Sequence, residues 1–290
     1  MSTSTPAPTP DRDPGASAAP RPAGAGDVAL DVRDLQVRIG PAHIVRGVSW
    51  QARQGRTLGI VGESGSGKSI TVMSATGLVR APRAQVTGSS VLTGRDGAAD
   101  LDLLTATDAQ RRGVLGGRIG FVFQDPSTSL NPILTVERQL TEGIEAHLGT
   151  TRRAARSRAL ELLELVGIPD PSRRLDTYPH ELSGGMRQRI MIAIALSCDP
   201  TLLIADEATT ALDVTIQAQI LDAVKDLQHR LGTAVVWISH DLAVVGGLAD
   251  EVVVLYGGQV VEQAETLDLF ARPSPPHTRG LLASRPRPGG

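Results

Sequence analysis

Residues 62–69 read Gly62-Glu63-Ser64-Gly65-Ser66-Gly67-Lys68-Ser69, which matches the phosphate-binding pattern GxxxxGK[ST]. The apolar run Thr57–Val61 before it predicts a short strand, and the residues after it predict a helix through about Leu78. In this context the glycines let backbone N–H groups converge on phosphate oxygens, and the start of the helix adds positive potential. All eight residues are therefore candidate nucleotide ligands, with Lys68 on the β- and γ-phosphates and Ser69 on Mg²⁺.

The basic residues of the chain make Lys68 stand out. Of the twenty-nine lysines and arginines, only Lys68 and Lys225 are lysines. A skew of this size indicates a coding bias, so arginine is the default cation and carries little information. A compact ammonium suits a phosphate loop better than a planar guanidinium does. Lys225 falls in the middle of a predicted helix, where we expect it to be exposed.

A second element of the same chemistry lies later in the chain. The four apolar residues Leu202–Ala205 predict a buried strand that ends in Asp206 and Glu207. Ligands of parallel sheets collect at the C-terminal ends of the strands. Asp206 is therefore predicted to hold Mg²⁺, through water or through Ser69, and Glu207 to polarise an attacking water. Together with the loop, this pair of carboxylates favours hydrolysis of a nucleotide over binding alone.

Strand and helix signals alternate along the rest of the chain. Residues Val28–Arg38 and His43–Ala52 predict an antiparallel hairpin. Further strands are predicted over Arg118–Phe123, Thr233–Ser239 and Glu251–Tyr256, and helical stretches over Leu130–Tyr178, Met186–Cys198 and Val214–Leu231. The pattern predicts an α/β fold: a mostly parallel sheet covered by helices, an N-terminal antiparallel β subdomain, and an inserted α-helical subdomain at about residues 127–182.

Composition excludes several other classes of protein. The net charge of -2, with two Trp, two Tyr and three Phe, argues against a nucleic-acid binder. The single Cys198 excludes an intrachain disulfide and an all-cysteine metal site. No apolar run approaches the roughly 18–20 residues that span a bilayer. Any association with a membrane is therefore expected to come through a partner.

The two ends of the chain differ in composition from its middle. Residues 1–26 are mostly Ala, Pro, Ser, Thr and Gly without apolar periodicity, which predicts a disordered arm. They also lack the apolar core of a signal peptide. Residues 271–290 are again rich in proline and predict a C-terminal tail. One folded domain is therefore expected over residues 27–270.

Further segments resemble the motifs of one family, the ATP-binding cassette (ABC) ATPases. Their signature, Q-loop, D-loop and switch histidine are matched by Leu182-Ser183-Gly184-Gly185-Met186, Phe123-Gln124-Asp125, Ala211-Leu212-Asp213 and Ser239-His240-Asp241. With the phosphate loop and the carboxylate pair in the same order, the chain resembles an ABC nucleotide-binding subunit over about residues 28–283. The resemblance implies a RecA-like P-loop NTPase core with ATP and Mg²⁺ as cofactors.

The resemblance also assigns roles to residues. Gln124 would contact Mg²⁺ and take part in catalysis together with Glu207 and His240. In the family two domains meet head to tail, and each ATP lies between one loop and the signature of the other domain. The remaining nucleotide contacts would come from Ile39, aligned with the adenine-stacking position, from Asp213, and, toward the partner's ATP, from Ser183, Gly184 and Gly185.

Longer segments are similar to one subfamily, the ATPases of dipeptide, oligopeptide and nickel importers. They are Gln124–Pro132, Tyr178–Arg189, Ala211–Leu221 and Pro276–Leu282. This similarity implies a peripheral subunit at the cytoplasmic face of the inner membrane. Its partners would be a second, similar ATPase subunit in a heterodimer, two membrane permease subunits and, indirectly, an extracytoplasmic solute-binding protein. Nucleic acid would not be a partner.

Two positions depart from the family pattern. Ala208 stands where proline usually follows the carboxylate pair, which relaxes φ next to Glu207. Ile39 stands where the adenine-stacking residue is usually aromatic and therefore lacks a π contribution. These departures leave open a weakly hydrolysing nucleotide-binding regulator. A soluble ABC ATPase acting on nucleic acid or ribosomes is the other alternative, and turnover stimulated by nucleic acid rather than by membrane partners would identify it.

Overall fold

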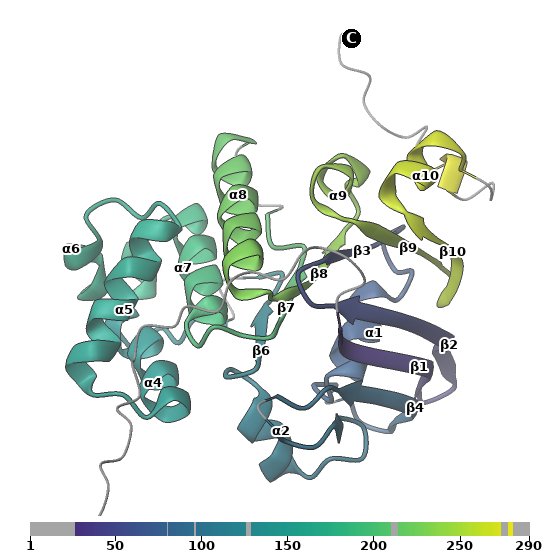
Figure 1. The fold of residues 1–290 in the computed structure, drawn as a ribbon, viewed down its shortest axis with the longest axis horizontal. Helices are drawn as coiled ribbons and strands as arrows, with labels where there is room; N and C mark the ends of the chain where they lie inside the picture. The colour runs from purple at the N-terminus through teal and green to yellow at the C-terminus, as the bar shows by residue number, and fades with distance from the viewer. Residues whose placement is uncertain are drawn as a thin grey trace, which may run out of the picture.

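The computed structural model describes residues 27–79, 81–95, 97–125, 129–209, 214–273 and 278–280. Figure 1 shows the helices α4–α7 on one side, the strands β1, β2 and β4 on the other, and the strands β3, β7 and β8 between them. In chain order the elements are β1 (Val28–Ile39), β2 (Ala42–Arg53), β3 (Thr57–Gly62), α1 (Lys68–Ala75), β4 (Ala84–Leu92), β5 (Leu101–Asp102), α2 (Asp108–Val114), β6 (Ile119–Val122), α4 (Val136–Leu148), α5 (Arg152–Leu165), α6 (Pro171–Leu175), η1 (Pro179–Glu181), α7 (Gly184–Leu196), β7 (Leu202–Asp206), α8 (Val214–Leu231), β8 (Ala234–Ser239), α9 (Leu242–Leu248), β9 (Glu251–Tyr256), β10 (Gln259–Glu265) and α10 (Thr266–Ala271).

The central sheet has the strand order β10-β9-β3-β8-β7-β6. Strands β9, β3, β8, β7 and β6 run parallel, and β10 pairs antiparallel with β9. Every residue of β3, β7 and β8 is buried, as expected for strands whose two faces are both covered by other elements. The predicted mostly parallel sheet is confirmed, and with it the α/β fold class.

Two apolar cores lie on opposite faces of this sheet. Side chains alternate between the faces, so Ile60 of β3 joins one core and its neighbour Val61 joins the other. The core around Ile60 contains side chains from β1, β2, β4 and α1. The core around Val61 contains side chains from α4, α5, α7, α8 and α9. Burial on both faces fixes the register of the strands that carry the predicted site.

The second sheet is antiparallel and has the order β2-β1-β4-β5. The predicted hairpin is confirmed, because β1 and β2 pair antiparallel from Val28 opposite Arg53 to Ile39 opposite Ala42. Strand β4 then adds to the other edge of β1, with Leu30 opposite Leu92 and Ile39 opposite Ala84. The apolar face of this sheet packs over α1, the helix that follows the phosphate loop.

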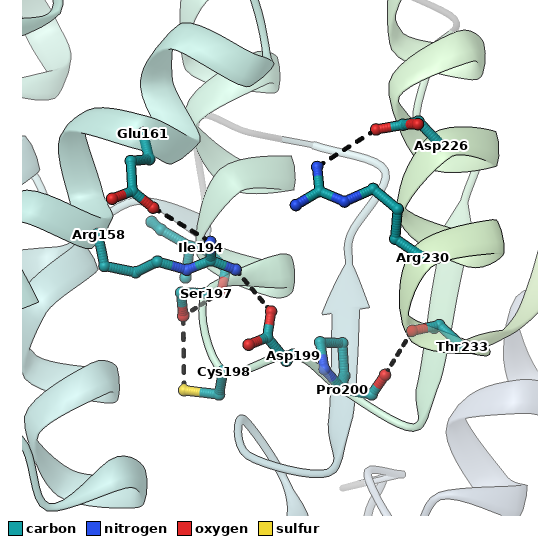
Figure 2. A network of polar contacts seen from close by, with 10 residues as sticks. All are labelled: Arg158, Glu161, Ile194, Ser197, Cys198, Asp199, Pro200, Asp226, Arg230 and Thr233. Carbon is teal, nitrogen blue, oxygen red and sulfur yellow. Dashed lines mark hydrogen bonds and ion pairs between the residues drawn. The ribbon is translucent and has the colours of Figure 1, made fainter. Parts of the chain in front are cut away.

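The helices α4, α5, α6 and α7 all belong to the connection between β6 and β7. Ion pairs attach α5 to its neighbours: Arg156 pairs with Glu137 of α4 at 2.6 Å, and Arg158 pairs with Asp199 at 2.5 Å. Figure 2 shows the Arg158 guanidinium between Glu161 of its own helix and Asp199, which lies in the turn from α7 to β7. The Arg158–Asp199 pair therefore joins the inserted helices to the entry of the strand that carries Asp206.

Several details bear on the sequence predictions. Cys198 is a buried free thiol next to Ser197, and burial raises its pKa (Figure 2). Lys225, expected to be exposed, is half-buried and donates from Nζ to the carbonyl of Gly247 at 2.7 Å. In the described ranges, no helix is long and apolar enough to cross a lipid bilayer. The predicted arm over residues 1–26 and most of the tail over 271–290 lie outside the described residues.

Candidate nucleotide-binding site

The predicted site residues come from neighbouring strands of the central sheet. Strand β8 lies between β3 and β7 and runs parallel to both. The phosphate loop follows β3, Asp206 ends β7, and His240 follows β8. The carboxyl ends of three adjacent parallel strands therefore meet at one edge, the position at which sheets of this kind bind ligands.

The turn between β9 and β10 contacts the phosphate loop and helps to fix its position. The N–H of Gly258 donates to the carbonyl of Ser66 at 3.1 Å, and the carbonyl of Gly258 accepts from the N–H of Arg46 at 2.8 Å. A Cβ at Gly258 would collide with the carbonyl of Ile44, and a Cβ at Gly62 would collide with that of Leu255. The close approach of these backbones requires glycine at both positions.

The loop fits a polyphosphate ligand. The hydroxyl of Ser66 is buried and, among the described residues, has no hydrogen-bond partner. A buried hydroxyl without a partner is destabilising unless a ligand or water satisfies it. Glu63, Ser64 and Gly65 are exposed, so the loop is open to solvent on the side away from the sheet. A phosphate oxygen can therefore reach a loop that already presents one unpaired polar group.

Lys68 lies at the first position of α1 and is buried, with 6% of its surface exposed. Its Nζ donates to the carbonyls of Gly62 at 2.8 Å and Glu63 at 3.0 Å. An ammonium has three N–H bonds, so a third donor remains for a phosphate oxygen. Burial lowers the pKa of Lys68, and the charges of Glu207 and Asp206 oppose that shift. Neighbouring carboxylates thus favour the charged form that a phosphate requires.

Asp206 and Ser69, the two residues predicted to hold Mg²⁺ together, lie in hydrogen-bond contact. The hydroxyl of Ser69 donates to Asp206 Oδ1 at 3.1 Å. Burial raises the pKa of Asp206, the hydrogen bond from Ser69 lowers it, and the charge of Glu207 raises it further. Hydroxyl and carboxylate oxygens are ligands that Mg²⁺ accepts, and this ion usually takes its other ligands from phosphates and water. Within the described residues, no group of three or more His, Cys, Asp or Glu side chains has an arrangement that could hold a metal ion by itself.

Glu207 lies between the other two predicted catalytic residues. Gln124 Nε2 donates to Glu207 Oε2 at 2.9 Å, and His240 Nδ1 lies 3.2 Å from Glu207 Oε1. Glu207 has a φ of 48°, a left-handed conformation that costs a non-glycine residue about 1–3 kcal/mol. Its backbone N–H donates to the carbonyl of Ile238 at 3.0 Å. The structure thus brings Gln124, Glu207 and His240 together, with the strained residue at the centre.

The signature residues lie at the start of α7. Ser183 caps α7 by accepting from the N–H of Met186 at 3.3 Å, and both Ser183 and Gly184 are exposed. A Cβ at Gly184 would meet no heavy atom within 4 Å. Gly185 is half-buried in the first turn of the helix. An exposed helix start with open space in front of it is the arrangement required of a segment that acts on a second chain.

The other predicted nucleotide contacts are less well placed by the structure. Ile39 is half-buried at the end of β1 and pairs with Ala42 across the hairpin. The next strand brings Ile44 close to the loop, since a Cβ at Gly67 would lie 3.4 Å from the Ile44 carbonyl. The hairpin that carries Ile39 therefore lies beside the loop. Asp213 falls outside the described residues.

Two residues of the site were not predicted from the sequence. Gly258 contacts the loop through its backbone, and the pair Gly257-Gly258 gives no indication in the sequence of what the turn touches. Gln188, in α7, donates from Nε2 to the carbonyl of Ala208 at 2.5 Å, next to Glu207. No local pattern predicts a hydrogen bond between a helix side chain and a backbone carbonyl 20 residues later.

Comparison with known proteins agrees with this geometry. The profile of the family described as ABC transporter matches residues 45–210. A probable peptide ABC transporter ATP-binding protein of Sinorhizobium fredii is 52% identical over 265 residues, which cover 90% of this chain and 77% of that protein. The oligopeptide transport ATP-binding protein of Bacillus subtilis is 48% identical over 261 residues, covering 89% and 72%.

A solved structure has the same fold. It is the dimeric post-hydrolysis state of an ATP-binding cassette bound to ADP and phosphate, with a TM-score of 0.71 and 26% sequence identity. The similarity covers 82% of this chain and 98% of that one. A profile match over more than half of the chain, close relatives and a cassette fold together with the loop, carboxylates and signature described above show that this chain belongs to the ABC transporter family, among its ATP-hydrolysing subunits.

Proposed function

We propose that this chain hydrolyses ATP to ADP and phosphate and thereby energises an importer of peptides or a related small solute. The observation that carries the proposal is the position of the Glu207 carboxylate, which is held by Gln124 and His240 beside Lys68 and Asp206. Relatives named as peptide and oligopeptide transport ATP-binding proteins support peptides as the solute class, with nickel as the alternative suggested by subfamily resemblance.

The residues divide the chemistry among them. Lys68 and the N–H groups of the loop would bind the phosphates, and Ser69, Asp206 and Gln124 would supply oxygen ligands for Mg²⁺. The bound Mg²⁺ would neutralise charge on the β- and γ-phosphates. The Glu207 carboxylate accepts a proton from the water whose oxygen bonds to the γ-phosphorus, while the bond from that phosphorus to the β–γ bridging oxygen breaks. His240 orients the carboxylate from its other side.

A complete site needs two such chains. Ser183, Gly184 and Gly185 would act on a partner's nucleotide. The exposure of Ser183 and Gly184 at the start of α7 and the similarity to a dimeric cassette support this arrangement. Asp213 and Ile39 would complete the nucleotide contacts at the dimer interface and the adenine. The partner is a similar but distinct ATPase subunit, so the pair is a heterodimer.

The remaining partners are two membrane permease subunits, with an extracytoplasmic solute-binding protein acting through them. The chain would then be peripheral, at the cytoplasmic face of the inner membrane. We divide it into an arm (1–26), a nucleotide-binding domain (27–270) with a helical subdomain at about 127–182, and a tail (271–290). The helical subdomain and the loop containing Gln124 would contact the permeases.

Reconstitution tests this function directly. The chain is co-expressed with candidate partners, a second ATPase subunit and two permease subunits, purified as a complex and assayed for ATP hydrolysis in lipid. We expect steady turnover that rises when peptide-loaded binding protein is added. Turnover stimulated by nucleic acid in the absence of permeases would favour a soluble ATPase. Mg-ATP binding without turnover would favour the nucleotide-binding regulator.

A further inference from the structure

A buried glutamine links the signature helix to the residue after the proposed general base. Gln188 is in the second turn of α7, and its side chain is 1% exposed. Its Nε2 donates to the carbonyl of Ala208 at 2.5 Å, and Ala208 is itself fully buried. The hydrogen bond therefore lies wholly inside the protein, where water cannot replace it.

The backbone at this point needs support. Glu207 has a φ of 48°, and a residue keeps such a conformation only when its surroundings fix it. On one side the N–H of Glu207 donates to the carbonyl of Ile238 at 3.0 Å. On the other side Gln188 holds the carbonyl of Ala208. Proline would restrict φ at position 208 through its ring, but alanine does not. The hydrogen bond from Gln188 therefore restrains the backbone at Ala208.

The arrangement is not the one that packing alone would favour. Gln188 Oε1 is buried and, among the described residues, has no hydrogen-bond partner. A buried amide side chain in which only the nitrogen or only the oxygen is hydrogen-bonded is less stable than one in which both are. The unpaired Oε1 of Gln188 thus lowers the stability of the folded protein. What the side chain contributes is to fix the position of the Ala208 carbonyl.

We propose that Gln188 is a positioning residue for catalysis, which holds the Glu207 main chain so that its carboxylate stays within reach of Gln124 and His240. This inference rests on the proposed hydrolytic function. Helix α7 begins directly after Ser183, so the helix that presents the signature to a partner also carries the support of this chain's own general base. Displacement of α7 would then move Glu207 relative to the water that it activates.

The test uses Gln188→Met in the assembled transporter complex. Methionine conserves the volume and removes the donor. We expect kcat for ATP to fall about 10–100-fold, the range seen when an outer support of a reactive group is lost, while the KM for ATP changes less than about twofold.

Gln228→Met is the matched control. Gln228, near the end of α8, is also buried and donates from Nε2 to Thr57 Oγ1 at 3.0 Å. Thr57 begins β3, at the end of that strand opposite the phosphate loop. If Gln188 has only a structural role, both variants should lower thermal stability and should have the same kcat. Equal kcat values for the two variants would overturn the proposal.

A double-mutant cycle with Glu207→Gln separates the mechanism from other defects. If Gln188 acts through Glu207, adding Gln188→Met to Glu207→Gln leaves the residual single-turnover rate unchanged. A further loss of the same size in that background contradicts the proposal. Inactivity of the wild-type complex would instead contradict the proposed function, so the two failures are distinguishable.

Ala208→Gly provides a second route if Gln188→Met reduces the yield of folded complex. This change loosens the same peptide group from its other end and leaves Gln188 in place. We expect a lower kcat at an unchanged KM. A wild-type kcat for Ala208→Gly would show that the position of this peptide group does not limit turnover and would overturn the inference.

Discussion

The hydroxyl of Ser69 donates a hydrogen bond to the carboxylate of Asp206 at 3.1 Å, across 137 residues of sequence. The two oxygens are separated by about the distance expected between neighbouring ligands of an octahedral ion with bonds of about 2.1 Å. The loop after β3 and the end of β7 are therefore already aligned for a shared cation. The same site contains two buried charged groups, the Asp206 carboxylate and the Lys68 ammonium. Both influence the stability of the folded protein.

Asp206→Asn should stabilise the nucleotide-free protein at neutral pH. Burial raises the pKa of Asp206 above its ordinary value of 3.8. Its contribution to stability is therefore present below that ordinary value and is lost as pH rises through the folded-state pKa. We expect Tm of the variant to exceed that of wild type by about 2–4 °C at neutral pH, with a difference that shrinks on acidification. Thermal melts across this range measure it, and the exposed change Asp226→Asn should have no such effect.

Glu207→Gln should separate binding from hydrolysis. The amide keeps the size of the side chain and loses its ability to accept a proton from water. We expect kcat to fall about 10²–10⁴-fold, the contribution of a general base, with ATP affinity conserved within about twofold. Equilibrium binding of a fluorescent ATP analogue and steady-state phosphate release measure the two quantities. Wild-type turnover in this variant would remove Glu207 from the catalytic role.

Lys68→Met should weaken nucleotide binding. The Lys68 ammonium is the buried cation that donates to the carbonyls of Gly62 and Glu63. Its loss should weaken ATP binding at least about tenfold, which corresponds to ~1.4 kcal/mol. Lys225→Met is the control, because the only other lysine donates to the carbonyl of Gly247 instead. Equal affinities for the two variants would contradict the assignment of Lys68.

Gly258→Ala should weaken ATP binding by displacing the phosphate loop. A methyl group there collides with the Ile44 carbonyl and disturbs the bond from Gly258 to Ser66. Such overpacking costs about 1–3 kcal/mol, which corresponds to a loss of about 5- to 150-fold in ATP affinity if the whole cost falls on the loop. Gly257→Ala is a close control, because Gly257 also has a positive φ but a Cβ there meets no atom within 4 Å. Both variants carry the left-handed penalty, and calorimetric titration should find a loss of affinity only for Gly258→Ala.

Arg158→Met should destabilise the attachment of the inserted helices. Arg158 pairs with both Glu161 and Asp199, and the second pair joins α5 to the turn before β7 (Figure 2). We expect a loss of about 1 kcal/mol in the free energy of unfolding, the upper range for partly exposed pairs. Arg230→Met, which removes the exposed pair with Asp226 within α8, should change it by less than about 0.5 kcal/mol. Urea titrations of both variants test the difference.

Local patterns predicted the elements whose burial is regular along the chain. Helix α8 and strand β9 have the expected bounds, because apolar residues recur in them at the period of a helix or form one buried run. Strand β4 was not predicted, since its residues Ala84–Leu92 include few large apolar side chains and Ser90 is buried. Its position is determined by pairing with β1, an interaction between distant segments. The short elements β5, α2, α9, β10 and α10 were also not predicted.

The residues of the candidate site also form two groups, those that the sequence predicts and those that it does not. Lys68, Asp206 and Glu207 could be predicted because a sequence pattern states their chemistry and the strands before them fix their positions. Gln188 and Gly258 could not, because each acts through one backbone contact to a segment brought near only by folding. Lys225 was expected to be exposed because the sequence does not show that folding brings the Gly247 carbonyl of α9 within hydrogen-bond distance of its ammonium.

The place of the inserted helices in the sheet has a consequence for how such a protein can diversify. Helices α4–α7 lie in the connection between β6 and β7, and within the described residues β6 is the last strand of the order β3-β8-β7-β6. The insertion therefore extends outward from the margin of the sheet and does not separate the strands that carry Lys68, Asp206 and His240. One contiguous segment can be exchanged while the registers of β3, β8 and β7 are conserved. If the inserted helices contact the permeases, as proposed, the residues that hydrolyse ATP and those that recognise the partner can change at different rates. One ATP-hydrolysing core can then serve transporters with different permease subunits.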